Sequence, residues 1–334
     1  MTKRRSPFAA TCAAALTLVV AATEASADDA LVVYCGRGEA LVGPLLERYE
    51  KASGRELDVR YNSTAALATQ LVTEADASPA DVAFFQDSGY LGAVADAGLL
   101  ATLPDELLDQ VDERFRDPDG RWVGTSGRAR VMVYDSAQVA PESLPATLAE
   151  LADPKWKGKL GWAPSNSSFQ AHVSALRHTW GDEETERWLT AMKDNEPKVY
   201  PKNSPQVLAA NDGEIAIGWV NHYYLHRLRT DDFNARNASF RTAGDIGNLL
   251  MVSGVGVREG SPRRDAALNL VRFLVGPEAA AYFAQESFEY PVRPGVETHE
   301  GVPSLDSLGL ATVDQRALAD VGPTLELLEK LGLQ

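Results

Sequence analysis

The sequence predicts a two-lobed α/β fold in which two long strands join the lobes. Short runs of apolar and β-branched residues alternate with amphipathic helical patterns, and this order is typical of a largely parallel sheet. It occurs in the first half of the chain and again in the second. Two long β-rich runs, 128–135 and 248–257, are flanked by segments of different lobes, so we expect them to cross between the lobes as a hinge. A cleft would then lie where strand ends and helix N-termini converge.

Residues 1–27 have the pattern of a secretory signal. A basic triplet at 3–5 precedes a short apolar stretch, and A-S-A at 25–27 matches an A-x-A cleavage site. Cys12 would leave with the signal, and it stands too early in the apolar stretch to be a lipid-attachment site. No later run approaches the ~18 apolar residues that a spanning helix needs. We therefore expect an exported, soluble protein that begins at Asp28.

The first half of the mature chain contains three strand–helix units. The strands are marked by apolar, β-branched runs, and the helices by an apolar face that recurs every three to four residues. Gly54 is the residue type that ends a helix in a left-handed turn. The expected order is strand 31–34, helix 40–53, strand 57–61, helix 65–74, strand 80–85 and helix 88–97.

The second half repeats this order with more helices. A Ser/Asn-rich loop at 164–168 follows the segment D-P-K-W-K-G-K-L-G-W-A-P, which contains a turn and a short buried strand. The expected elements are strand 128–134, helix 144–151, helices 169–179 and 182–194, strand 199–200, a helix from 204, strand 214–220, the run 248–257, helices 262–275 and 277–286, and helix 313–331. We accordingly expect one lobe in 28–127 plus 255–300, the other in 128–254, and a C-terminal helical segment, 301–334, that packs on both.

Charge and cysteine content exclude some functions. The formal charge is −15, and it becomes −17 when the signal removes three basic residues and one acidic residue. An acidic surface argues against nucleic-acid or anionic-lipid partners. Cys35 is the only cysteine left, so no intramolecular disulfide can form, and a lone cysteine is typically a buried small apolar residue.

Tyr223 and Tyr224 are adjacent in W-V-N-H-Y-Y, where an apolar strand leads into a helix. A tyrosine phenol stays protonated up to a pKa of about 10, so it is a poor ligand for most divalent ions. A small, highly charged ion such as Fe³⁺ can displace that proton. On a continuous helix the two side chains would diverge by about 100°, but at a strand-to-helix junction both can point to one cleft. Packing in the core is the alternative role for such a pair.

Four stretches make the chain similar to the periplasmic ferric-iron-binding protein family. They are V-V-Y-C-G-R-G-E at 32–39, S-P-A-D-V-A-F-F-Q-D at 78–87, S-G-R-A-R-V-M-V-Y-D at 126–135 and G-E-I-A-I-G-W-V-N-H-Y-Y at 213–224. The similarity spans nearly the whole mature chain. It implies a type II, transferrin-like periplasmic binding protein whose cleft lies between lobes joined by hinge strands, and which carries Fe³⁺ to the inner-membrane permease of an ABC importer.

The resemblance also implies site residues. The family's tandem tyrosine ligands fall on Tyr223 and Tyr224. Its loop for a synergistic anion, carbonate or phosphate, resembles the 164–168 segment, where hydroxyls, amides and free N–H groups at a helix start suit such an anion. The expected anion contacts are Ser165, Asn166, Ser167, Ser168, Asn203, Asn221, Arg128, Arg130 and Arg37.

The chain departs from the family at two ligand positions. A histidine of the first strand–helix loop is replaced by Gly38, and a glutamate after the A-D-V stretch is replaced by Gln86. Glu39 and Asp87 lie next to these positions and could serve as ligands instead. The resemblance therefore implies iron binding but leaves the remaining ligands and the anion open.

Other functions remain as alternatives. His222 and His226 would share a helix face as zinc ligands do, but they supply only half of a zinc site. Cys35 could be a nucleophile, but no motif supplies a base, a G-x-S-x-G elbow or a P-loop, so we expect no enzyme. A receptor of the same fold for a polyamine, thiamine or a phosphonate is the nearer alternative. We expect the ferric-iron receptor to be a monomer.

Overall fold

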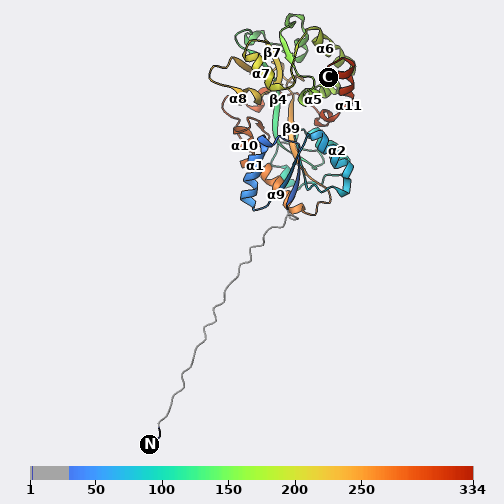
Figure 1. The fold of residues 1–334 in the computed structure, drawn as a ribbon, viewed down its shortest axis with the longest axis vertical. Helices are drawn as coiled ribbons and strands as arrows, with labels where there is room; N and C mark the ends of the chain where they lie inside the picture. The colour runs from blue at the N-terminus through green and yellow to red at the C-terminus, as the bar shows by residue number, and fades with distance from the viewer. Residues whose placement is uncertain (1, 3–29, 334) are drawn as a thin grey trace.

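The computed structural model describes residues 2 and 30–333, so the predicted signal segment lies outside the described residues apart from Thr2. Figure 1 shows two bodies, one above the other, with β4 (Val123–Asp135) and β9 (Leu250–Val257) running between them. The sheet order is β2-β1-β3-β9-β4-β7-β5-β6, and β8 and β10 also pair with β4. The two-lobed α/β fold predicted from the sequence is the observed one.

The lower body is built on three parallel strands, with β1 between β2 and β3. Buried apolar side chains cover both faces of these strands, so helices pack on each side. Its elements are β1 (Leu31–Cys35), α1 (Glu39–Ser53), β2 (Leu57–Tyr61), α2 (Thr64–Glu74), β3 (Val82–Phe85), α3 (Ser88–Asp96), α4 (Asp105–Leu108), α9 (Arg264–Leu274), α10 (Pro277–Gln285) and β10 (Tyr290–Pro291).

The upper body surrounds a second group of strands. β5 pairs in parallel with β6 and β7, and β7 and β8 run antiparallel to β4. Its elements are β5 (Leu160–Trp162), α5 (Ser167–Trp180), α6 (Asp182–Asp194), β6 (Lys198–Val199), α7 (Asn203–Asn211), β7 (Ile217–Asn221), α8 (Tyr223–Leu228), β8 (Ala235–Ala238) and α11 (Val321–Lys330).

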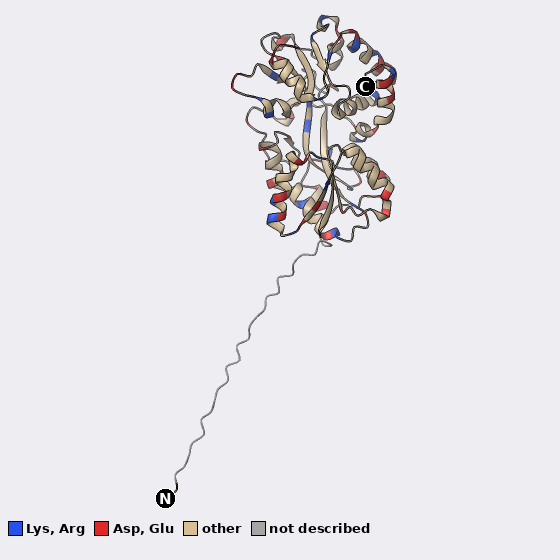
Figure 2. Ribbon diagram, in the orientation of Figure 1, with Lys and Arg blue, Asp and Glu red and all other residues tan. Residues whose placement is uncertain are grey.

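β4 belongs to both bodies. Its residues 123–129 pair with β9, and its residues 130–134 pair with β7. All thirteen of its residues are buried. In Figure 2 most charged residues lie on the outer helices, whereas the central strands are tan except for a blue stretch on β4. That stretch contains Arg128 and Arg130, which are 1% exposed each.

The C-terminal segment packs against both bodies. A 3₁₀ turn, Gln315–Ala319, contacts α3 below and α5 above. At Gly89 a Cβ atom would lie 2.7 Å from the backbone nitrogen of Ala319, so only glycine allows this approach. Gln315 accepts a hydrogen bond from Ser88 Oγ at 3.1 Å and donates to the carbonyl of Leu250 at 3.1 Å.

Some elements differ from the sequence-based expectations. The expected helix at 144–151 is replaced by a 3₁₀ helix, Leu148–Ala152, because Pro145 restricts the residue before it to extended backbone, and Leu144 has φ −62° and ψ 149°. The expected helix at 313–331 is divided at Asp320. The sheet is mixed rather than largely parallel, since β4 and β9 run antiparallel to their neighbours. β8 was not expected at all. Among the described residues, no helix has the length and apolar character needed to cross a membrane.

Candidate metal and anion site

Tyr223 and Tyr224 lie where β7 turns into α8. Their rings stack, with centroids 4.3 Å apart and planes inclined by 29°. They are the first two residues of α8, preceded by Asn221 at the end of β7 and by His222. The side chains therefore point to the same region, as the strand-to-helix junction allows. Tyr223 is buried and Tyr224 is half-buried, so the pair has one open side.

The environment of Tyr223 opposes ionisation in the absence of a cation. Burial raises the pKa of the Tyr223 phenol well above its usual value, and the neighbouring Tyr224 raises it further. The Arg128 guanidinium acts in the opposite direction. A proton will therefore leave Tyr223 only for a species that stabilises the phenolate strongly.

A polar cluster surrounds Arg130, which we call the Arg130 cluster: Arg130, Asn166, Ser168, Asn203 and Asn221. Arg130 Nη1 donates to Asn221 Oδ1 at 3.1 Å, to Ser168 Oγ at 3.2 Å and to Asn203 Oδ1 at 3.4 Å. Asn203 Nδ2 lies 3.1 Å from Ser168 Oγ and 3.4 Å from Asn166 Oδ1. Five of the nine anion contacts expected from the sequence are thus brought together from β4, β7 and the starts of α5 and α7.

The Arg130 cluster has a rigid base. Arg130 Nη2 donates to the carbonyl of Trp219 at 2.8 Å, and the guanidinium lies 4.9 Å from the centroid of the Trp219 ring. That ring is fixed by edge contacts with Phe169 and Trp188 and by His172, with centroids 5.3, 5.7 and 4.4 Å away. The role of Trp219 had no signal in the sequence beyond its place on an apolar strand.

Negative charge is favoured beside Arg130. Burial lowers the pKa of the Arg130 guanidinium to about 9, and the nearby charge of Arg128 lowers it too, whereas ionised Tyr224 and Tyr223 would raise it. In the described part of the chain, Arg130 Nε is buried and has no hydrogen-bond partner. A phenolate or a bound anion would stabilise the charged Arg130 guanidinium, and it would also give the buried Nε an acceptor.

Arg128, whose charge lowers the pKa of Tyr223, is bound to the lower body. It forms a buried ion pair with Asp87, with Nη2 2.6 Å from Oδ1, and it also donates to the carbonyl of Gln86. Asp87 immediately precedes α3. Within the described residues, Arg128 Nε and Nη1 are buried without a partner, so part of this guanidinium is free to meet an anionic group.

Arg37 has its partners elsewhere. Its guanidinium is buried and pairs with Glu289 at 2.7 Å, donates to Ser126 Oγ at 3.2 Å and also donates to Ser253 Oγ. Ser126 Oγ in turn donates to Glu289 Oε2 at 2.5 Å. Glu289 and Ser253 were not singled out in the sequence, because nothing local marks two residues so distant along the chain from Arg37.

Three further predicted residues are exposed. Glu39 is the first residue of α1, and Ser165 and Ser167 flank Asn166 at the start of α5. Asn166 caps α5 by accepting from the Ser168 backbone N–H at 3.1 Å. The first turn of α5 therefore presents a polar N-terminus next to the Arg130 cluster. No hydrogen bond joins Glu39 to the tyrosine pair.

The zinc alternative finds no support. His222 Nδ1 accepts from the Ala129 backbone N–H at 3.1 Å, and Nε2 donates to the Phe288 carbonyl at 2.7 Å, so both ring nitrogens are occupied. His226 instead stacks on the Phe288 ring with centroids 5.7 Å apart. In residues 30–333 no three His, Cys, Asp or Glu side chains converge as metal ligands.

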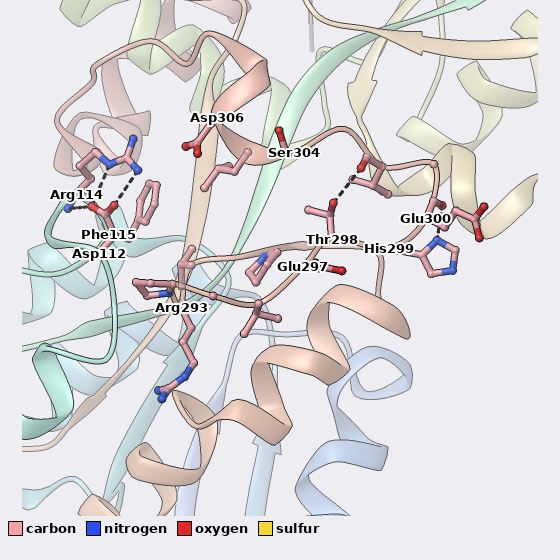
Figure 3. A pocket seen from close by; sticks show the side chains of 18 residues that line it. Asp112, Arg114, Phe115, Arg293, Glu297, Thr298, His299, Glu300, Ser304 and Asp306 are labelled. Atoms are coloured by element: carbon pink, nitrogen blue, oxygen red, sulfur yellow. Dashed lines mark hydrogen bonds and ion pairs between the residues drawn. The ribbon is translucent and has the colours of Figure 1, made fainter.

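A pocket of about 640 Å³ lies away from these residues, under the loop at 291–306. Figure 3 shows its labelled side chains, with Asp112 and Arg114 joined as an ion pair and His299 beside Glu300. Arg293 is bound to the carbonyl of Val275 at 3.0 Å. None of the site residues expected from the sequence lines this pocket, and its charged groups do not converge on a common point.

Comparisons with known proteins agree on one family. Residues 77–307 match the family model described as bacterial extracellular solute-binding protein. A relative from Serratia marcescens named Fe(3+)-binding periplasmic protein is 33% identical over 326 residues, covering 96% of each chain. Iron uptake protein A1 of Synechocystis is 32% identical over 86% of this chain and 81% of its own.

Solved structures give the same result. Iron-bound HitA from Pseudomonas aeruginosa superposes with a TM-score of 0.84 at 30% identity, covering 91% of this chain and 99% of that chain. These relatives are named as binding or uptake proteins, which agrees with the expectation that the chain is not an enzyme. A family model that matches most of the chain, and a relative that matches nearly all of it, assign this chain to the bacterial extracellular solute-binding protein family.

Proposed function

We propose that this protein is a periplasmic receptor for ferric iron, which it binds through Tyr223 and Tyr224 together with a small anion. The stacked tyrosine pair beside two buried arginines is the observation that carries this proposal. The relatives named for ferric-iron binding support the identity of the ion.

The chemistry of the pair favours a trivalent ion. Burial raises the pKa of the Tyr223 phenol, so this group holds its proton at neutral pH and a weakly polarising cation cannot bind it as a phenolate. Fe³⁺ is small and highly charged, and it lowers the pKa of a bound acid far enough to displace the proton. Arg128 and Arg130 would then balance the new negative charges.

The Arg130 cluster is the proposed site of the synergistic anion. Carbonate or phosphate would meet the Asn and Ser groups of the cluster, the N-terminus of α5 and the hydroxyls of Ser165 and Ser167. Arg130 has a free buried donor in the described structure, and Arg128 has two. Both terminal nitrogens of Arg37 are bound by Glu289 and two serines, and only its buried Nε has no partner in the described structure, so we propose that Arg37 is a structural cation at the crossing of β4 and β9.

The lower body offers few ligands to complete the iron shell. Gly38 and Gln86 occupy the positions where the family has histidine and glutamate. To bind the ion, Asp87 would have to break its ion pair with Arg128. Glu39 would have to extend from the exposed start of α1 to the tyrosine pair. We therefore propose that the anion and water fill most of the remaining positions.

Transport would use the two-body architecture. We propose that β4 and β9 are the hinge between a lobe made of 28–127 plus 255–300 and a lobe made of 128–254, with 301–334 packing on both. The monomer, exported by a signal cleaved after Ala27, would close on iron and release it at an inner-membrane ABC permease. Binding to the closed form stabilises that form by mass action.

A panel of solutes tests this function. The metal-stripped mature protein is heated with ferric citrate, a polyamine, thiamine or a phosphonate, and the unfolding midpoint is recorded. A ligand at 100 times its Kd adds about 2.7 kcal/mol of stability, so ferric iron should raise the midpoint by several degrees. Citrate alone is the control. A rise with one of the organic solutes and none with iron would replace this proposal by the same-fold alternative.

A further inference from the structure

His222 is the residue immediately before the tyrosine pair, and hydrogen bonds hold both its main chain and its side chain. Its backbone N–H donates to the Ala129 carbonyl at 3.0 Å, and its own carbonyl accepts from Asn237 Nδ2 at 2.8 Å. Its side chain is 2% exposed. Both the main chain and the side chain of this residue are therefore fixed.

The imidazole ring connects two other segments. Because a backbone N–H can only donate, Nδ1 accepts from Ala129 and the proton lies on Nε2, which donates to the Phe288 carbonyl. The ring also packs on Tyr290, with centroids 4.5 Å apart, and meets the edge of Tyr223 at 5.9 Å.

These partners belong to the region where the two bodies join. Ala129 lies on β4 at the point where its pairing changes from β9 to β7. Phe288 lies between α10 and β10, and β10 pairs with β4 through Tyr290 and Gly127. Phe288 has φ +60°, a left-handed conformation that is uncommon for a bulky residue. The Phe288 carbonyl is thus presented to His222 by a strained and well-supported turn.

We propose that His222 is a positioning residue for iron binding: by joining the strand-to-helix junction to β4 and to the Phe288 turn, it sets the orientation of the Tyr223 and Tyr224 rings. The inference rests on the proposed function. His222 is not itself a ligand, because both nitrogens are used. Groups that orient a metal's ligands typically change metal affinity about 10–100-fold when removed.

The test compares two buried side chains that each bond to one backbone N–H and one backbone carbonyl. His222→Phe keeps the ring packing but removes both hydrogen bonds. Asn248→Leu is the matched control, because Asn248 accepts from the Phe240 N–H at 2.8 Å and donates to the Phe240 carbonyl at 2.9 Å in the upper body. Ferric affinity is measured by competition with citrate, and the phenolate-to-iron absorption maximum is recorded for each protein. His222→Phe should weaken affinity about tenfold or more and shift the maximum, whereas Asn248→Leu should only lower the unfolding midpoint.

The outcomes separate this inference from the function on which it rests. Wild-type affinity and an unshifted maximum in folded His222→Phe would overturn the positioning role, as would equal changes in Asn248→Leu. If His222→Phe does not fold, His222→Ser is the second variant, since water can enter the vacated space and satisfy both backbone groups. His222→Ser should likewise weaken ferric affinity about tenfold or more and shift the absorption maximum. Absence of the band in the wild-type protein would instead overturn the proposed function.

Discussion

The ring of Tyr223 stacks on the ring of Tyr224 with centroids 4.3 Å apart, directly after the strand that ends at Asn221. Tandem residues on a continuous helix would diverge by about 100°, yet these two rings stack at the start of α8 with planes inclined by 29°. Arg128 lies close enough to Tyr223 to lower the pKa of that phenol, and ionisation of either tyrosine would raise the pKa of Arg130. The two arginines thus favour phenolates at this site, although burial favours the uncharged form of Tyr223 until a cation arrives.

Iron binding should release protons and weaken as pH falls. The raised pKa of Tyr223 means that this phenol is protonated in the metal-free protein and must lose its proton to bind. If both tyrosines ionise, the logarithm of the affinity should rise with pH with a slope of about two after correction for the competing chelator. In Tyr224→Phe the slope should fall by about one. A slope that this substitution leaves unchanged would exclude Tyr224 as an ionising ligand.

The substitution Arg130→Lys should make ferric affinity nearly independent of the added anion. Lysine lacks the planar fork that contacts Ser168, Asn203, Asn221 and the Trp219 carbonyl together, so the Arg130 cluster should lose its arrangement. We expect the dependence of ferric affinity on added carbonate or phosphate to be largely lost, and the free energy of unfolding to fall by about 1–3 kcal/mol. Arg236→Lys, which alters another arginine bound to backbone carbonyls in the upper body, is the control. Unchanged anion dependence in Arg130→Lys would place the anion elsewhere.

Asp87→Asn should destabilise the metal-free protein strongly. The Asp87–Arg128 pair is buried, and removing the carboxylate leaves a buried guanidinium uncompensated, which costs about 3–5 kcal/mol of unfolding free energy. Denaturant unfolding measures this loss. Replacing both partners, Asp87→Asn with Arg128→Met, should recover much of it, whereas Asp58→Asn in an exposed pair should cost less than about 1 kcal/mol. A loss below that of Asp58→Asn would contradict the importance of the pair.

Cys35 should be inert in the folded protein. Burial raises the pKa of its thiol to about 11, and the residue is 0% exposed at the end of β1. At pH 8 about one thiol in a thousand would be ionised even if a reagent could reach it. Reaction with a disulfide reagent should therefore be slow in buffer and rapid in denaturant. Rapid reaction of the native protein would reopen a chemical role for Cys35.

Local features of the site could be predicted from the sequence. An apolar strand that ends directly before a tyrosine pair is visible in W-V-N-H-Y-Y, and the structure has β7 followed at once by α8. Asn166 at a helix start was also recognisable from its type and place. These features involve only neighbouring residues, whose periodicity and capping chemistry are present in the chain itself.

Other features depend on contacts that periodicity cannot reveal. Arg37 meets Glu289, which is distant in sequence, so its pairing could not be expected. The gathering of Asn203 and Asn221 around Arg130 likewise depends on how β4, β7 and α7 come together. The tautomer of His222 is set by its hydrogen bonds to Ala129 and Phe288. These residues are distant from His222 in the sequence, and no local pattern indicates that they meet.

The most direct test of the account is a visible absorption titration of the metal-stripped mature protein with ferric citrate, with carbonate and phosphate supplied. We predict a phenolate-to-iron charge-transfer band that weakens in Tyr223→Phe and again in Tyr224→Phe. Tyr200→Phe, which alters a half-buried tyrosine whose hydroxyl faces Glu214 at 3.5 Å, should leave the band intact. No band in the wild-type protein, or a band that neither substitution weakens, would contradict the claim that the tandem tyrosines hold the ion.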